Sequence, residues 1–209
     1  MELGCGAALL AHRRAGHAVT MLVMTTGRGE SEQRLRPVEQ EEAAALLQAK
    51  LLWGGFQDGY VPDGEQAVLV IENAIATTGA EIIYTHAAAD SHQDHRAVAA
   101  ATAAASRRTR RVLAYESPTS LGFSPSHFID VEGLVEAKLN LIRVHLSQVM
   151  KNGLVDLEAV EAQTRFRGFQ ARVRHAEAFV ASRFLWDICS HNAISPYMNN
   201  IDPVKEISL

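Results

Sequence analysis

The fold is decided by residues 80–98, AEIIYTHAAADSHQDHRAV. The apolar first part is typical of a buried strand, and the alanines that begin at Ala97 are typical of a helix. Two histidines and two aspartates lie between them, at 90–95. In a parallel α/β sheet, the loops that follow the strands carry the functional side chains. The stretch therefore predicts a strand, loop and helix with a functional site in the loop.

The same alternation of strands and helices continues on both sides of this unit. Because parallel strands need a crossover between them, the alternation predicts parallel βαβ units. We expect an α/β fold with a Rossmann-like, doubly wound, mostly parallel sheet. A C-terminal helical extension follows, with one long helix over 135–149 whose apolar residues are spaced four, three, four and three apart. The remaining strands are predicted at 17–27, 50–56 and 111–117, and the remaining helices at 2–15, 35–48 and 68–79.

Composition narrows the class of protein. The chain has 209 residues, of which 47% are hydrophobic and 21% charged, and its net charge is −4. This size suits a single domain over residues 1–209, and the mixed charge gives no electrostatic reason to expect nucleic acid as a partner. No apolar run reaches the ~18 residues of a membrane span, and two cysteines are too few for a disulfide framework. We therefore expect a cytoplasmic protein.

The loop at 90–95 has two interpretations. His92 and His95 are three residues apart, so both rings can point to one side of a helical start. One neutral imidazole could bind a metal while the other donates a proton, and Asp94 could orient either ring. Alternatively, Asp90, Ser91 and Asp94 could simply cap the helix, because acids and small polar residues suit its first turn.

Six segments of the chain carry a family resemblance. They are ELGCGAALLAHRRAGHAVTMLVMTTGRGE at 2–30, RPVEQEEAAALL at 36–47, GGFQDGYV at 54–61, HQDH at 92–95, FIDVEGLVEAKLNLIRVHLSQ at 128–148 and HAEAF at 175–179. In this order they resemble the PIG-L/LmbE-like family of zinc-dependent N-deacetylases, which remove acetyl groups from N-acetylglucosamine-type sugars. The resemblance extends over nearly the whole chain, and HQDH matches the H-x-D-H signature of the family.

The resemblance implies a role for each loop residue. In the family, zinc is held by a His and an Asp of an N-terminal H-P-D-D motif and by the last His of H-x-D-H, which is His95 here. His92 would donate a proton or stabilise the oxyanion, and Asp94 would hydrogen-bond to His92 and raise its basicity. The implied reaction is hydrolysis of an N-acetyl group by zinc-activated water. The substrate would be an aminosugar conjugate whose acyl group and aglycone stay open.

Two further positions match residues that face the sugar in the family, Arg36 and Asp58. Both also have ordinary structural interpretations. Arg36 could pair with Glu39 on the same helix face, and Asp58 could form the turn before Gly59.

The H-P-D-D motif is absent from the chain, and Met1 occupies the variable position that follows it in the family. We expect a start codon assigned too late, or a fragment, so that two zinc ligands, the general base and the first strand lie upstream. The alternative is a genuine short protein without the motif. A catalytic zinc site needs three protein ligands, and one His does not supply them. The chain as given is therefore expected to be inactive.

Other functions stay open at this point. The chain could be a degenerate, non-catalytic family member that binds a sugar or a protein, or an enzyme of another class in which His92 and Asp94 act without metal. The resemblance also allows a homo-oligomer, with residues 197–209 as an interface arm. Trp53 and Trp186 are predicted to lie in the core.

Overall fold

The strands form two separate ladders. The computed structural model describes residues 1–149 and 155–187. Within these ranges, β1 (Thr20–Thr25) and β2 (Lys50–Phe56) form a two-stranded parallel sheet. The second sheet contains, in spatial order, β3 (Ile82–His86), β4 (Arg111–Tyr115), β6 (Ala176–Phe184) and β5 (His127–Asp130). Strands β3 and β4 are parallel, whereas β6 is antiparallel to both β4 and β5.

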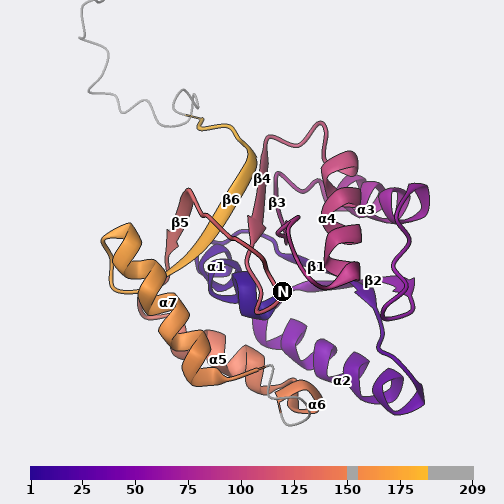
Figure 1. Ribbon diagram of the computed structural model, residues 1–209, viewed down its shortest axis with the longest axis horizontal. Coiled ribbons are helices and arrows are strands. Elements are labelled where there is room, and N and C mark those ends of the chain that lie inside the picture. Colours follow the sequence, from indigo (N-terminus) through magenta and orange to yellow (C-terminus); the bar gives the residue numbers. More distant parts are fainter. Residues whose placement is uncertain (150–154, 188–209) are drawn as a thin grey trace, which may run out of the picture.

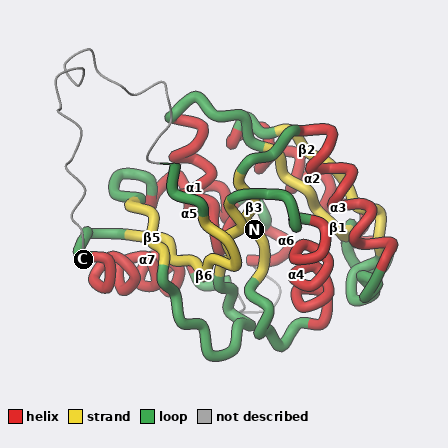
Figure 2. The backbone as a smooth tube through the Cα atoms, turned by 90° about the horizontal axis from the view of Figure 1, so that it is seen from above, coloured by secondary structure: helices red, strands yellow, loops and turns green. Residues whose placement is uncertain are grey.

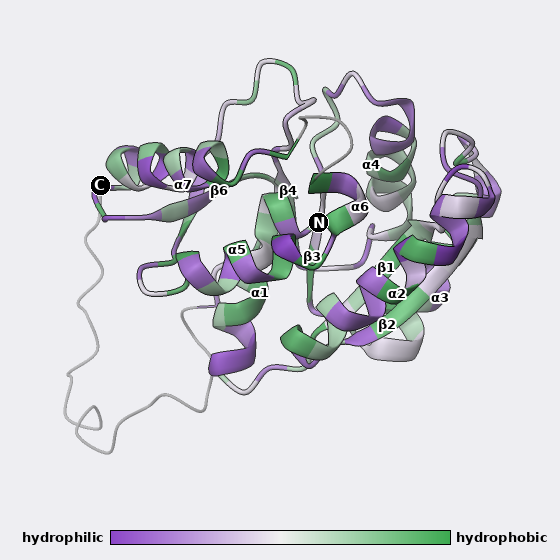
Figure 3. Ribbon diagram, turned by 90° about the horizontal axis from the view of Figure 1, so that it is seen from below, coloured by the Kyte–Doolittle hydropathy of each residue, from purple (hydrophilic) through white to green (hydrophobic). Residues whose placement is uncertain are grey.

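Helices cover both sides of these strands (Figure 1). Two of them contact each other and the strands β1 and β3, namely α3 (Glu65–Thr78) and α4 (Gln93–Ala105). The other side carries α1 (Glu2–Arg14), α2 (Glu30–Leu47), α5 (Val135–Arg143), α6 (Leu146–Val149) and α7 (Leu157–Ala171). In Figure 3, hydrophobic and hydrophilic residues alternate along the helices, as expected for helices with one face on the core. The predicted doubly wound α/β fold is confirmed.

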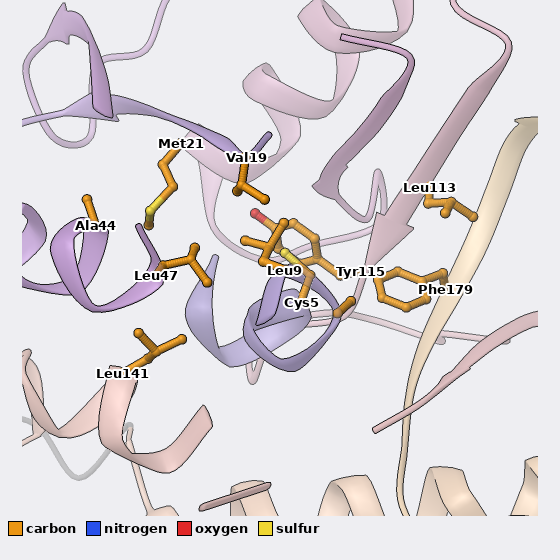
Figure 4. Packing of buried hydrophobic residues seen from close by; sticks show 11 residues of the cluster. Cys5, Leu9, Val19, Met21, Ala44, Leu47, Leu113, Tyr115, Leu141 and Phe179 are labelled. Atoms are coloured by element: carbon orange, nitrogen blue, oxygen red, sulfur yellow. The ribbon is translucent and has the colours of Figure 1, made fainter. Parts of the chain in front are cut away.

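Helix α1 joins the two sheets. A side chain at Gly4 would collide with the ring of Tyr115 and with the backbone of Glu116, so this small residue is a requirement of close packing. Only 1% of the surface of the neighbouring Cys5 is exposed, so its side chain packs in the core. The cluster around α1 combines its Cys5, Ala8 and Leu9 with Val19 and Met21 of β1, Ala44 and Leu47 of α2, Leu113 and Tyr115 of β4, Leu141 of α5 and Phe179 of β6 (Figure 4).

A buried ion pair fixes α1 against the strands. Lys138 and Glu177 lie 2.6 Å apart, and each side chain is 2% exposed. The Glu177 carboxylate accepts hydrogen bonds from the backbone N–H groups of Ala7 and Ala8, while Lys138 donates to the carbonyl of Leu3. Every partner of this pair is a backbone or side-chain group of the core, so the pair serves the packing of α1.

Several local predictions are corrected by the structure. The single helix expected over 135–149 is divided into α5 and α6, because the helix stops at Arg143 and restarts at Leu146. The C-terminal extension also contributes strands β5 and β6, which lack a clear apolar alternation in the sequence. Trp186 is 77% exposed, so its predicted core position is wrong, whereas Trp53 is partly buried. The expected arm at 197–209 lies outside the described residues.

None of the helices in residues 1–149 and 155–187 is both long and apolar enough to cross a membrane.

Candidate functional site

The loops at the carboxyl ends of β2, β3 and β4 meet at one place. The carboxylate of Asp94, at the start of α4, accepts hydrogen bonds from the backbone N–H groups of Gly59 and Val61, at 2.6 and 3.1 Å. The hydroxyl of Ser117, which follows β4, donates to the carboxylate of Asp90 at 2.7 Å. Three loops that are distant in sequence are therefore bonded together around residues 90–95.

Asp90 is the buried centre of this arrangement. Its side chain has no exposed surface, and its oxygens bind Nδ1 of His95 at 3.0 Å and the backbone N–H of His92 at 2.8 Å. Burial by itself would raise the pKa of Asp90, but hydrogen bonds from Thr119, His92, Ser117 and His95 outweigh it, and the pKa is lowered. Asp90 is thus an ionised acceptor that orients the ring of His95.

This contact leaves one nitrogen of His95 available. Because the ionised Asp90 accepts from Nδ1, the lone pair of the neutral ring is on Nε2. No residue in the described ranges hydrogen-bonds to this Nε2. Burial lowers the pKa of His95, and the contact with Asp90 offsets this only in part, so the neutral form of the ring is favoured near pH 7.

Three imidazole rings stack at this point. His95 lies between His86, with ring centroids 3.8 Å apart, and His92, with centroids 4.5 Å apart. Burial lowers the pKa of His86 well below its ordinary value, and the neighbouring His95 adds to this effect. Sequence reasoning did not assign His86 to the site. The available signal was its position as the last residue of β3, at the carboxyl edge of the sheet.

Asp94 has a different partner from the one that the resemblance implies. Both oxygens of its carboxylate bind the backbone of residues 59–61, whereas the ring of His92 accepts a hydrogen bond from the backbone N–H of Asp94 at 3.2 Å. His92 is the N-cap of α4, so its Nδ1 is occupied by this N–H. The Asp94 carboxylate therefore holds the loop after β2 beside His92.

Arg36 and Asp58 are brought together at the same edge. Their charged groups lie 3.5 Å apart, with 30% and 25% of the side chains exposed. The alternative pairing of Arg36 with Glu39 is not found, because the Glu39 carboxylate accepts hydrogen bonds from the N–H and hydroxyl of Ser147. A hollow of about 290 Å³ lies next to Asp58 and His92.

Two places at the site offer donors for a cation. One is the single imidazole of His95, whose ring is oriented by Asp90. The other is a group of three side chains, Asp58, His92 and Asp94, whose donor atoms lie within 4.8 Å of one another. In this second group both Asp94 oxygens already accept backbone hydrogen bonds, and Asp58 pairs with Arg36. These oxygens are therefore less available to a metal than the Nε2 atom of His95.

A cavity of about 1010 Å³ reaches all the predicted site residues. Its lining includes Arg36, Asp58, His92, Asp94 and His95. Met1 also lines it, and Figures 1, 2 and 3 all place the N-terminus beside β3. The positive α-amino group of Met1 contributes to the lowered pKa values of His86 and His95, which agrees with its position close to the stacked rings. The first residue of the chain thus lies at the site.

The fold and the site define a Rossmann-like α/β protein with imidazoles and carboxylates at the carboxyl edge of its strands. Comparison with known proteins identifies the family within this class. The family model described as "PIG-L: GlcNAc-PI de-N-acetylase" matches residues 1–106. The uncharacterized deacetylase YaiS of Escherichia coli (strain K12) is 34% identical over 158 residues, which cover 70% of this chain and 85% of that protein. The chain belongs to the PIG-L family, and the resemblance read from its motifs is confirmed.

Solved structures support the same fold. The conserved protein TT1542 from Thermus thermophilus superimposes with a TM-score of 0.78 at 24% identity, covering 88% of this chain and 90% of that one. The N,N'-diacetylchitobiose deacetylase from Pyrococcus horikoshii gives a TM-score of 0.74 at 20% identity, covering 96% and 84% of the two chains. At these identities the likeness concerns the fold.

Proposed function

We propose that this chain is part of a zinc-dependent N-deacetylase that hydrolyses the acetamide of an N-acetylglucosamine-type conjugate in the cytoplasm. The observation that carries the proposal is the geometry of His95. A buried carboxylate holds its Nδ1, and its Nε2 has no partner in the described residues. A histidine oriented by a carboxylate in this way is the usual form of a zinc ligand in proteins.

The donor chemistry of the site suits zinc. A neutral imidazole is a preferred zinc donor, and burial keeps the ring of His95 neutral near pH 7. When bound, the metal would polarise the acyl carbonyl and lower the pKa of a water molecule. His95 supplies one ligand of the three that a catalytic site requires.

The remaining donors and the general base are proposed to come from residues that precede Met1. The first residues of the chain line the same cavity as His95. A segment that leads into α1 would therefore pass next to the stacked imidazoles. On this proposal the active enzyme is a chain that includes those residues.

His92 has the geometry of a hydrogen-bond donor to the reacting carbonyl oxygen. Its Nδ1 accepts the N–H of Asp94, so the proton of the neutral ring is on Nε2, the atom that can face substrate. In this form the ring would donate a hydrogen bond that stabilises the developing oxyanion. Asp94 has a positioning role, because its carboxylate binds the backbone of residues 59–61 and keeps this loop beside the His92 ring.

The sugar is proposed to contact Arg36 and Asp58. Both line the cavity that contains His92, and both are partly exposed, so their polar atoms can exchange the ion pair for sugar hydroxyls. The names of the relatives support this substrate class: the family model is described by a GlcNAc-PI substrate, and one structural neighbour deacetylates N,N'-diacetylchitobiose.

The decisive experiment uses a chain extended upstream in frame. Acetate release from N-acetylglucosamine conjugates and bound zinc are measured for the extended protein and three variants. We expect His95→Ala to lose zinc and activity. We expect His92→Ala to keep zinc and to lose about 100- to 10,000-fold in rate.

The third variant separates the two candidate cation groups. Asp58→Asn should keep zinc and mainly raise KM. If zinc binding were lost in Asp58→Asn but retained in His95→Ala, the metal would belong to the group of Asp58, His92 and Asp94, and the proposed role of His95 would be wrong. A sugar affinity that is indifferent to chelators, without acetate release, would instead identify a non-catalytic binding protein.

A further inference from the structure

The loop between β4 and β5 reaches Asp90 with several polar groups. The hydroxyl of Ser117 donates to Oδ2 of Asp90 at 2.7 Å, and the hydroxyl of Ser120 lies 3.3 Å from the same oxygen. This oxygen also binds Nδ1 of His95, and the hydroxyl of Thr119 lies 3.3 Å from that nitrogen. The orientation of the His95 ring therefore depends on where this loop lies.

The backbone of this loop is paired with the loop that contains Asp90. The N–H of Ser91 donates to the carbonyl of Thr119, and the N–H of Leu121 donates to the carbonyl of Ala89, both at 2.9 Å. A two-stranded ladder of this kind is at best marginally stable by itself. Contacts with the rest of the molecule must therefore fix its place.

One side chain of α7 holds the start of this loop. Arg167 binds Glu116, the residue directly after β4, through Nε at 2.7 Å to one carboxylate oxygen and through a terminal nitrogen at 2.6 Å to the other. Only 12% and 13% of these two side chains are exposed. A bidentate arginine–carboxylate pair that is shielded from water is strong and has a defined geometry. The guanidinium also lies over the ring of Phe123, 5.6 Å from its centroid, so Arg167 contacts both ends of segment 116–123.

Helix α7 is a firm support for this contact. It lies beside β5 and β6 (Figure 1). At Gly168, the residue next to Arg167, a side chain would collide with the backbone of Arg174 and His175, so the helix packs closely on the chain that leads into β6. The position of the guanidinium is therefore set by the packing of the sheet.

We propose that Arg167 is a positioning residue for His95. It holds Glu116 and thereby the loop whose hydroxyl groups hold Asp90, and Asp90 orients the imidazole. Arg167 is not among the residues that line the cavity of about 1010 Å³, so it acts through these other residues. The inference rests on the proposed function, because the role of His95 as a zinc ligand comes from there.

The first test uses the 209-residue chain and needs neither zinc nor substrate. Arg167→Met removes the guanidinium and keeps a long side chain. We expect hydrogen exchange at the N–H groups of Ser91 and Leu121, which pair the two loops, to become about 10-fold faster, because the ladder opens more often when its support is lost.

The matched control is Arg183→Met. The guanidinium of Arg183 binds the carbonyls of Ser106 and Thr109, which precede β4 at the opposite edge of the sheet. This variant also loses hydrogen bonds of an arginine, but it should leave the exchange at Ser91 and Leu121 at the rate of the parent.

The second test uses the chain extended upstream. Arg167→Met should weaken zinc binding about 3- to 10-fold, measured by competition with a chelator, and lower kcat about 10-fold. KM should change little, because the proposed sugar contacts Arg36 and Asp58 lie on other segments. Arg167→Lys keeps the charge and one hydrogen bond but lacks the planar fork, so it should recover part of the zinc affinity. Arg183→Met should match the parent in zinc affinity, kcat and KM.

Three results would overturn the proposal. One is unchanged exchange at Ser91 and Leu121 in Arg167→Met. Another is zinc affinity and kcat equal to those of the parent. The third is an equal loss in Arg183→Met, which would indicate a general loss of stability. The extended parent separates this proposal from the proposed function: a parent that neither binds zinc nor releases acetate contradicts the function, whereas an active parent matched by Arg167→Met contradicts only the role of Arg167.

Discussion

Asp90 and Glu177 are both carboxylates buried in the interior, yet they lie in contrasting surroundings. Glu177 is enclosed by Lys138 and by two backbone N–H groups of α1, and every group in this cluster has a partner. Asp90 binds one nitrogen of His95 and leaves the other without a partner in the described residues. The difference teaches that burial of a charge does not mark a functional site. The mark is an oriented atom that the fold leaves available on a cavity wall.

The largest expected effect concerns Glu177, the carboxylate whose partners all belong to the core. Glu177→Ala leaves the Lys138 ammonium buried without a counter-charge and two N–H groups of α1 unpaired. We expect a loss of about 3–5 kcal/mol in the free energy of unfolding, measured by urea denaturation. The matched control is Glu136→Ala, because Glu136 pairs with Arg143 at the surface. That control should cost less than about 1 kcal/mol. Equal costs for the two variants would remove the distinction.

The next largest effect concerns Asp90, the carboxylate that orients His95. In the upstream-extended protein, Asp90→Asn should weaken zinc binding about 10- to 100-fold, because the His95 ring loses the carboxylate that orients it. Competition with a chelator measures this affinity. Asp156→Asn is the control, since Asp156 also accepts backbone N–H bonds but does so at the start of α7. If both variants held zinc as tightly as the parent, Asp90 would belong with Glu177 as a purely structural carboxylate.

A third prediction concerns Glu2, a buried carboxylate at the first residue of α1. Burial would raise its pKa, but the α-amino group of Met1, His145 and Gln40 outweigh burial, and the pKa lies well below the ordinary value of 4.5. A depressed carboxyl pKa stabilises the folded state above 4.5, and this stabilisation is lost as the pH falls from there toward the folded value.

Glu2→Gln should therefore make the free energy of unfolding depend less on pH under acidic conditions. The free energy of unfolding of the parent should fall more steeply below pH 4.5 than that of the variant. At pH 7 the variant should be less stable by about 1–3 kcal/mol. Urea midpoints measured from about pH 7 to about pH 3 compare the two, and parallel curves would contradict the assignment.

The smallest effect on stability is expected at the Arg36–Asp58 pair. Because both side chains are partly exposed, Arg36→Lys should change the free energy of unfolding by less than about 1 kcal/mol. In the extended enzyme it should raise KM several-fold with little change in kcat, since Lys lacks the planar fork of Arg. A large loss of stability with unchanged KM would make this pair structural.

Much of the architecture follows from local sequence patterns. Strand β3, helix α4 and the loop between them are predicted by an apolar run, an alanine-rich run and a polar cluster, and the structure has each of them in place. Period and capping are properties of neighbouring residues, so a single sequence displays them. The division of α5 from α6 and the strands β5 and β6 are less visible, because partners distant in sequence decide them.

The sequence by itself determined the family, the alternation of elements and the position of the histidine loop. Only the tertiary structure decided which carboxylate holds His95. That partner is Asp90, locked by Ser117 from another strand end, while Asp94 turns to Gly59. Tertiary structure also stacked His86 on His95. The physical reason is that hydrogen-bond partners and cavities arise where chain segments converge, and spacing along one segment does not encode that convergence.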